Sequence, residues 1–268
     1  MNTGKISIRL KWPLAAVVAL LAGAGLVRAA RAGAEDDGIE YREMRSVGGA
    51  RYHVVRVDLT RVELRMYWRD DAGRPFGSLA ALERWLTGRG DTLLAATNAG
   101  IFYRTRLPAG LHVERGRELR PLNTVPDPPR GEAPGNFFYR PNGVFFIDDD
   151  GRARIAETGA ARRALPRMRE ATQSGPLILL DGEPHWLVGR AVSRNAVAVC
   201  SPTEVAMVFA PDGVTVRDLA LFIRDELKCR DALYLDGTIS GLSVPSARVR
   251  WDGSYVGILA ATARRDRP

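Results

Sequence analysis

Short apolar runs rich in β-branched and aromatic residues recur along the chain, and many of them stop at Gly, Asn or Asp. Such runs are typical of β-strands that end in turns. They lie at residues 52–59, 62–68, 92–97, 144–147, 177–180, 196–200, 205–209 and 232–235. Two stretches show the 3–4 spacing of amphipathic helices instead, at residues 78–86 and 215–228. The sequence therefore predicts an α+β fold of mixed, largely antiparallel sheets with a few covering helices.

The N-terminus has the features of an export signal. A basic stretch from Lys5 to Lys11 precedes an apolar run of 14 residues, Leu14 to Val27, which is short for a membrane span. Ala32-Gly33-Ala34 offers an A-x-A cleavage site, and a cut after Ala29 is an alternative. An uncleaved anchor would be the only contact with a membrane. Either outcome places the domain outside the cytoplasm, in the periplasm or the extracellular space.

The remaining chain is expected to form one domain. Its 268 residues, 46% of them hydrophobic, suffice for a sizeable core, and no linker or repeat interrupts residues 50–260. Residues 35–50 are expected to be an irregular lead-in, and residues 104–142, rich in Pro, Gly, Asn and Arg, a long irregular loop of the functional kind. The predicted organisation is residues 1–34 as signal or anchor and residues 35–268 as the domain.

The charge balance argues against nucleic acid as a partner. The formal net charge is +8, but five cations lie before residue 35 with no acid among them, and subtracting them leaves +3. A charge of +3, without a zinc-finger spacing or an RNA-binding aromatic motif, is weak support for DNA or RNA. It suits anionic sugars or phosphates as well.

Cysteine and acidic residues give little sign of a metal. Cys200 and Cys229 could pair in an oxidising compartment or stay as two buried thiols. The three histidines are scattered, so no metal site is predicted. The run Asp148-Asp149-Asp150-Gly151 lacks the spaced ligands of a calcium loop and is interpreted as a hairpin turn. No cofactor is assigned.

Four segments share one pattern, in which an apolar run ends in small residues that carry a polar group. Asn and Asp at a strand end can present side chains and neighbouring N–H groups to a ligand, and Gly permits close backbone approach. Each motif alone is an ordinary turn. Their co-occurrence predicts that the four segments converge on one cleft. They span residues 96–103, 135–145, 171–176 and 232–240.

At these segments, over about residues 98–240, the chain resembles the phosphodiester glycosidase family. The family's Asn-Gly-Gly-Phe-type motif corresponds to residues 98–102, its Gln-Ser-Gly-Pro segment to 173–176, its Ser-Arg pair to 193–194, and its Asp-Gly-Gly-x-Ser motif to 236–240, after a Cys-x-Asp-Ala junction at 229–232. Ala99 and Thr238 stand where the family often has Gly, which suggests a bacterial envelope subgroup.

The resemblance implies an exported hydrolase that removes a sugar joined through its anomeric carbon to a phosphodiester. The phosphate is already a good leaving group, so stabilising its charge matters more than a strong general acid. Arg194 is expected to grip phosphate oxygens, unless it is a structural arginine paired with a carboxylate. Asp236 is expected to activate water or stabilise the oxocarbenium-like centre, or else only to form its turn. Asn98 completes the proposed catalytic set.

Further residues are expected to bind the sugar or the phosphate. They are Gln173, Ser174, Gly175, Asn136, Asn142, His112, Gly237 and Ser240. Asn142 could equally be a turn residue and His112 a packing residue, and Ser174 lacks the partner histidine of a nucleophile. Aromatic residues are most simply core or cleft wall, with one or two stacking on a sugar: Tyr103, Phe137, Phe138 and Trp186.

Two functional hypotheses follow. One is a glycosidase acting on sugar-1-phosphodiesters of envelope or exopolysaccharide type, and it is favoured by Asp236, Arg194 and Asn98 occurring together. The other is a non-catalytic envelope protein that binds glycans or assists assembly with the same fold, and it is favoured by the departures at Ala99 and Thr238.

Overall fold

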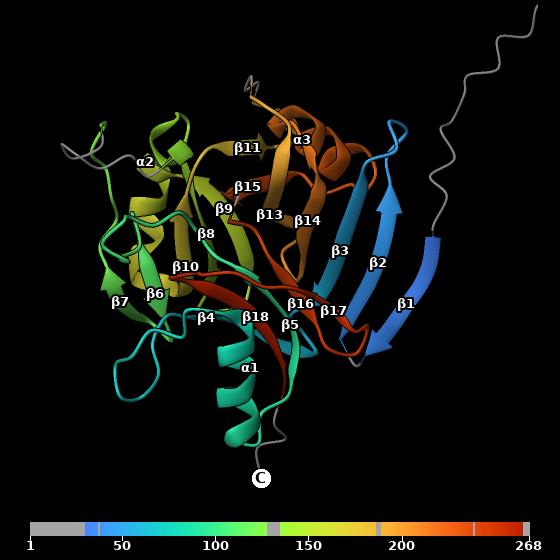
Figure 1. Cartoon of the computed structure of the whole chain (residues 1–268). Helices are drawn as coiled ribbons and strands as arrows, with labels where there is room; N and C mark the ends of the chain where they lie inside the picture. Colours follow the sequence, from blue (N-terminus) through green and yellow to red (C-terminus); the bar gives the residue numbers. More distant parts are fainter. Residues whose placement is uncertain (1–29, 37, 128–134, 186–188, 238, 265–268) are drawn as a thin grey trace, which may run out of the picture.

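A computed structural model describes residues 30–36, 38–127, 135–185, 189–237 and 239–264. This part of the chain forms three antiparallel sheets with helices packed against them (Figure 1). None of its helices is long and apolar enough to cross a membrane. Residues 1–29 of the predicted signal segment, residues 1–34, lie outside the described residues, and residues 30–34 belong to the first strand, Ala30–Asp36.

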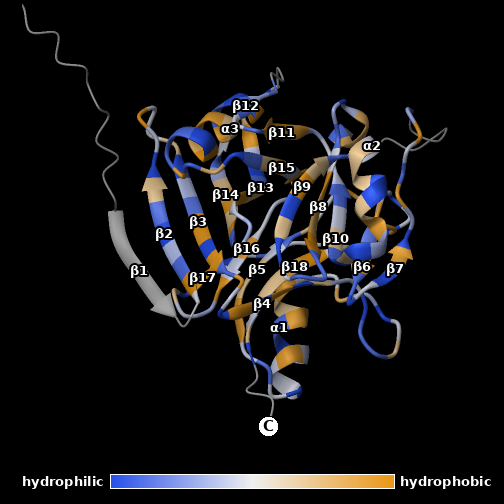
Figure 2. Ribbon diagram, turned by 180° about the vertical axis from the view of Figure 1, so that it is seen from behind, coloured by the Kyte–Doolittle hydropathy of each residue, from blue (hydrophilic) through white to orange (hydrophobic). Residues whose placement is uncertain are grey.

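The largest sheet has eight strands in the order β1-β2-β3-β14-β13-β15-β11-β12. The region from residue 35 to 50, expected to be irregular, instead contains all of β2, which pairs with β3 along its whole length. The apolar pattern of β2 is weak because only Ile39 and Tyr41 are buried. Its polar colouring in Figure 2 agrees with this. The strands are β1 (Ala30–Asp36), β2 (Ile39–Arg45), β3 (Arg51–Asp58), β11 (Leu177–Leu180), β12 (Glu183–Pro184), β13 (Val192–Ser201), β14 (Glu204–Val214) and β15 (Asp231–Asp236).

The second sheet has the order β7-β6-β10-β8-β9. Its strands are β6 (His112–Glu114), β7 (Arg117–Arg120), β8 (Gly143–Asp148), β9 (Ala153–Glu157) and β10 (Met168–Ser174). The expectation of an irregular loop over 104–142 is therefore wrong in part, because this region holds the β6–β7 hairpin and a 3-10 turn, η1 (Gly135–Phe138).

The acidic run between β8 and β9 is a hairpin turn, as predicted. Arg154 forms an ion pair with Asp148, and Arg167 pairs with both Asp149 and Asp150. All three carboxylates of the run are therefore paired with arginines of the protein.

The third sheet has the order β17-β16-β5-β18-β4. Its strands are β4 (Val62–Tyr67), β5 (Leu93–Asn98), β16 (Leu242–Val244), β17 (Val249–Trp251) and β18 (Ile258–Ala263). One hydrophobic cluster draws residues from all three sheets, among them Val197 of β13, Phe145 of β8 and Leu259 of β18. The three sheets therefore meet in this shared core cluster.

Two helices cover the sheets, as the sequence predicted. Helix α1 (Leu79–Gly88) is capped by Ser78 and buries Leu79, Leu82 and Leu86 against the third sheet. Helix α3 (Val216–Asp225) begins with the capping box of Thr215 and Asp218 and packs on the eight-stranded sheet. A short helix, α2 (Thr158–Ala161), and a 3-10 turn, η2 (Arg162–Arg167), lie between β9 and β10. A disulfide between Cys200 and Cys229 ties the end of β13 to the segment after α3.

Candidate active site

Two strand ends from different sheets are joined by one side chain. Asn98 ends β5 of the third sheet, and Asp236 ends β15 of the eight-stranded sheet. Asn195, fully buried in β13, donates from Nδ2 to Oδ1 of Asn98 at 2.9 Å and to the Asn98 carbonyl at 3.1 Å. Its Oδ1 accepts the backbone N–H of Asp236 at 3.0 Å. The cluster Asn98–Asn195–Asp236 therefore spans the junction of the two sheets.

The turn after Asp236 is fixed to the same cluster. Oδ1 of Asn98 also accepts the backbone N–H of Gly241 at 2.9 Å. The Ser240 hydroxyl lies 3.3 Å from Oδ1 of Asn195 and 3.2 Å from the Asp236 carbonyl. Asn98 and Ser240 thus hold the two ends of the turn that presents the Asp236 carboxylate.

The second sheet meets this junction through the end of β10. The Ser174 hydroxyl donates to the Leu235 carbonyl at 3.0 Å and accepts the Ile101 N–H at 3.4 Å. The loop after Asn98 lies directly on β10, since a Cβ on Gly100 would sit 2.3 Å from the Gln173 carbonyl oxygen. Three of the four strand-end segments therefore meet where the three sheets come together.

The Asp236 carboxyl has a perturbed pKa. Burial raises its pKa to about 6, and a hydrogen bond from the Gly237 N–H to Oδ1, at 2.6 Å, opposes that rise. Within the described part of the chain, no cation forms an ion pair with it. A carboxyl with a pKa near neutrality can exchange protons or carry charge at physiological pH.

Arg194 lies deeper, and its guanidinium is held by protein oxygens. It is 4% exposed, and it donates to the carbonyls of Val214 and Arg190, both at 2.6 Å, and to the Tyr234 hydroxyl at 2.9 Å. No salt bridge links it to a carboxylate of the described residues, so the alternative of a structural ion pair has no support among them. These three bonds, one from each guanidinium nitrogen, hold Arg194 inside the protein against the Tyr234 ring.

The fourth segment, residues 135–145, begins with η1 and contacts the site through Tyr234. The Asn136 side chain hydrogen-bonds the Tyr234 hydroxyl, whose pKa burial raises to about 12. Gly175 packs under η1, where a Cβ would lie 2.6 Å from the Phe137 carbonyl oxygen. Gly237 packs on the Tyr234 hydroxyl in the same way, because a Cβ on Gly237 would lie 2.5 Å from the phenol oxygen.

Three predicted binding residues, Gln173, Asn142 and His112, form their hydrogen bonds with other parts of the protein. Gln173 bonds the backbone of Leu111 and Asn123 through its buried amide. These contacts point it away from Ser174, as alternation along β10 requires.

Asn142 and His112 are likewise engaged elsewhere. Asn142 donates to the Phe137 carbonyl at 3.0 Å and accepts from Arg140 at 2.8 Å, which supports η1. His112 is fully buried, with Nε2 2.8 Å from a Glu114 oxygen. Both fit the turn and packing alternatives rather than direct ligand binding.

The aromatic candidates are mostly core. Phe137 is fully buried, and Tyr103 and Phe138 pack partly buried against the same cluster. Trp186 and Thr238 lie outside the described residues.

Sequence reasoning missed Asn195 and Tyr234. Both lie inside strands and follow no turn signal, with Tyr234 in the apolar run 232–235 and Asn195 directly before the run 196–199. The available sign for Asn195 was a polar residue, directly after Arg194, at the start of the otherwise apolar run 196–199.

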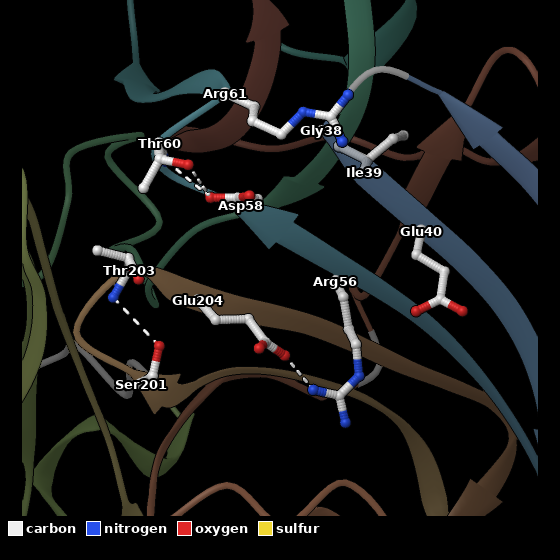
Figure 3. A pocket seen from close by; sticks show the side chains of 10 residues that line it. All are labelled: Gly38, Ile39, Glu40, Arg56, Asp58, Thr60, Arg61, Ser201, Thr203 and Glu204. Atoms are coloured by element: carbon white, nitrogen blue, oxygen red, sulfur yellow. Dashed lines mark hydrogen bonds and ion pairs between the residues drawn. The ribbon is translucent and has the colours of Figure 1, made fainter.

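A separate surface hollow of about 590 Å³ lies near the start of β2, lined by residues of β2, β3 and the β13–β14 hairpin (Figure 3). Arg56 there pairs with Glu204, and Asp58 accepts from the Thr60 hydroxyl at 2.7 Å. None of the predicted site residues lines it, and it carries no functional assignment.

Solved structures share this fold. The catalytic domain of zebrafish N-acetylglucosamine-1-phosphodiester alpha-N-acetylglucosaminidase, auto-inhibited by its pro-peptide, superposes with a TM-score of 0.56 at 15% identity, covering 89% of this chain and 88% of that one. A hypothetical protein from Synechocystis gives a TM-score of 0.56 at 14% identity, covering 85% and 62% of the two chains. At such identities the likeness establishes the fold alone.

Sequence comparison goes further. The Escherichia coli (strain K12) protein named Uncharacterized protein YigE is 30% identical over 192 residues, which cover 70% of this chain and 72% of that protein. The family model described as Phosphodiester glycosidase matches residues 91–252, a span that contains Asn98, Asn195 and Asp236. The chain therefore belongs to the phosphodiester glycosidase family.

Proposed function

We propose that this protein is an exported hydrolase that cleaves a sugar from a sugar-1-phosphodiester of envelope or exopolysaccharide type. Family membership points to a glycosidase, and the observation that carries the finer proposal is the placement of Asp236. Its carboxyl, with a pKa raised to about 6, ends a strand where three sheets meet. Arg194 is buried, forms no salt bridge with a carboxylate of the described residues, and donates to the hydroxyl of Tyr234, two residues before Asp236 in β15.

The reaction needs few groups from the protein. Water adds to the anomeric carbon, the bond from that carbon to the phosphate oxygen breaks, and the phosphate monoester leaves with the bonding electrons. Asp236 activates the water or stabilises the positive charge that develops on the sugar. The cation of Arg194 favours the negative charge on the leaving phosphate. Asn98, Asn195 and Ser240 hold the carboxylate-bearing turn in place.

The test is turnover of a panel of sugar-1-phosphodiesters by the purified protein, with release of free sugar and phosphate monoester as the two readouts. Equal release of both products from at least one substrate supports the proposal. Binding of these glycans without turnover of any of them would contradict it and favour the glycan-binding alternative.

The exported location is tested separately, by fractionation of cells that make the full chain. We expect the protein outside the cytoplasm. Recovery of intact, soluble protein from the cytoplasm would refute export.

A further inference from the structure

The hydrogen bonds of Arg194 determine what it can do at the site. Nε and one terminal nitrogen donate to backbone carbonyls, and the other terminal nitrogen donates to the Tyr234 hydroxyl. A guanidinium has five N–H donors, but here each nitrogen already has a partner on the protein. Tyr234, which bonds Arg194 and contacts Gly237, connects this charge to the Asp236 turn.

The Tyr234 hydroxyl can act as a hydrogen-bond donor. A phenol carries one donor and two acceptor sites, and the bond from Arg194 occupies an acceptor site. Burial raises its pKa to about 12, so it stays protonated at neutral pH. Hydrogen bonds from Arg194 and from the Asn136 amide lower that pKa, as donors to the oxygen do, so both acceptor sites are occupied and the proton is left to point towards the turn at Gly237.

The surroundings of that hydroxyl favour an anion. Gly237 packs directly on the buried phenol oxygen, where a Cβ would lie 2.5 Å away, so only a residue without a side chain lets the turn that carries Asp236 lie against the hydroxyl. Among the described residues no carboxylate forms a salt bridge with Arg194. An uncompensated buried cation strengthens the attraction for a bound anion, and it polarises a hydroxyl to which it donates.

We propose that the Tyr234 hydroxyl donates to an anionic oxygen of a phosphate-bearing ligand beside Asp236, and that Arg194 is a positioning residue acting through Tyr234. The inference rests on the proposed function for the identity of the anion as the phosphate of the substrate. The direct contact is thereby assigned to Tyr234, which lies in the segment 232–240 but is not among the predicted site residues.

The first experiment measures binding by titration calorimetry, with inorganic phosphate and with the free neutral sugar as separate probes. Tyr234→Phe removes only the hydroxyl and should weaken phosphate binding about 10-fold or more, the loss of a hydrogen bond to a charged group. Its affinity for the neutral sugar should stay within about twofold of wild type, on the same reasoning. Tyr52→Phe is the matched control, because Tyr52 is a buried tyrosine of the same core cluster, stacked on Phe222, and should leave both affinities unchanged.

The second experiment is a double-mutant cycle with Arg194→Lys, chosen because it keeps the charge in a buried position. If Arg194 acts through Tyr234, then Arg194→Lys weakens phosphate binding in wild type and adds nothing in the Tyr234→Phe background. Additive losses would overturn the positioning role. Thermal unfolding of all variants separates these effects from loss of structure.

The outcomes distinguish this inference from the proposed function. Phosphate binding that depends on Tyr234, in a protein that hydrolyses no sugar-1-phosphodiester, would refute the function and support the inference. Phosphate affinity unchanged by Tyr234→Phe, in an active enzyme, would overturn the inference and leave the function standing.

Discussion

Asn195 and Asp236 lie opposite each other on β13 and β15, and Oδ1 of Asn195 accepts the Asp236 backbone N–H at 3.0 Å. The same side chain binds Asn98 on another sheet at 2.9 Å. An uncharged residue in the middle of a strand thus sets the position of the carboxylate proposed to do the chemistry. The geometry of the site depends on the register of two sheets, and several predictions test that dependence.

Asn195→Ala should lower both stability and activity. It leaves the Asp236 N–H without its partner and removes one of the two donors to Oδ1 of Asn98, which costs about 1–3 kcal/mol of unfolding free energy. Denaturant unfolding and kcat/KM on a sugar-1-phosphodiester measure the two effects. Thr97→Val, which removes one hydroxyl bonded to the same amide at 2.8 Å, is the milder comparison. Wild-type stability and turnover in Asn195→Ala would show that the cluster does not organise the site.

Asp236→Asn should abolish most hydrolysis while sparing ligand binding. The amide keeps the shape and the hydrogen bonding but removes the charge, so kcat/KM should fall on the order of 10²-fold or more. In wild type kcat/KM should rise as the pH increases through about 6, because the carboxyl, whose pKa burial raises to about 6, must ionise. That limb of the profile should disappear in the variant.

Asp212→Asn provides the control for this substitution. Asp212 is half-exposed and pairs with Arg51 on the surface, with a nitrogen–oxygen distance of 2.6 Å. Its loss should leave turnover and the pH profile as in wild type. Full activity in Asp236→Asn would remove the catalytic assignment.

His53 should make the fold less stable in mild acid. Burial lowers its pKa below the ordinary value of 6.5, and nearby Arg51 lowers it further, while Glu43 and Asp212 oppose the shift. The unfolded chain takes up the proton near pH 6.5 and the folded chain resists it, so stability is intact above 6.5 and falls as the pH drops below it. Unfolding free energies of wild type and His53→Phe between pH 7 and 5 should therefore diverge in slope. Parallel curves would show that His53 does not contribute.

Reduction of the Cys200–Cys229 disulfide should destabilise the protein without changing the site. The two residues are separated by 29 positions, and closing a loop of that size contributes about 3–4 kcal/mol in the chain-entropy model. Denaturation with and without reductant measures the difference, and Cys200→Ser with Cys229→Ser should reproduce the reduced state. Thiol titration of denatured, unreduced protein that found two free thiols would refute the pairing.

Local sequence patterns predicted many of the helices and strands because they indicate which face of an element is buried and where the element begins or ends. The leucines of α1 and the Thr215–Asp218 box of α3 specify which residues are buried and where a helix starts. Strands such as β2 escaped prediction because mostly charged residues flank the few buried ones. The hairpin at 112–120 was missed for a related reason. Its strands are short, and both turn residues, Arg115 and Gly116, have positive φ, a conformation that arginine rarely signals.

The candidate site was predictable only where polar residues end strands. Asn98 and Asp236 follow apolar runs directly, and the structure joins them. Gln173 follows the same pattern, but alternation along β10 turns its amide to the opposite face from Ser174. Which face a side chain takes depends on sheet pairing, and no local motif carries that information.

The loop after β17 links the site to a distant helix. The carboxylate of Asp252 accepts the N–H groups of Leu79 and Ala80, both at 2.9 Å, at the start of α1. Close by, the ring of Tyr255 fills the space beside Gly241, the residue whose N–H is held by Asn98. Opening the first turn of α1 would loosen the loop that supports the site. We therefore expect the helix and the site to open as one cooperative unit, so that amide hydrogens at both places exchange with solvent through a shared opening event.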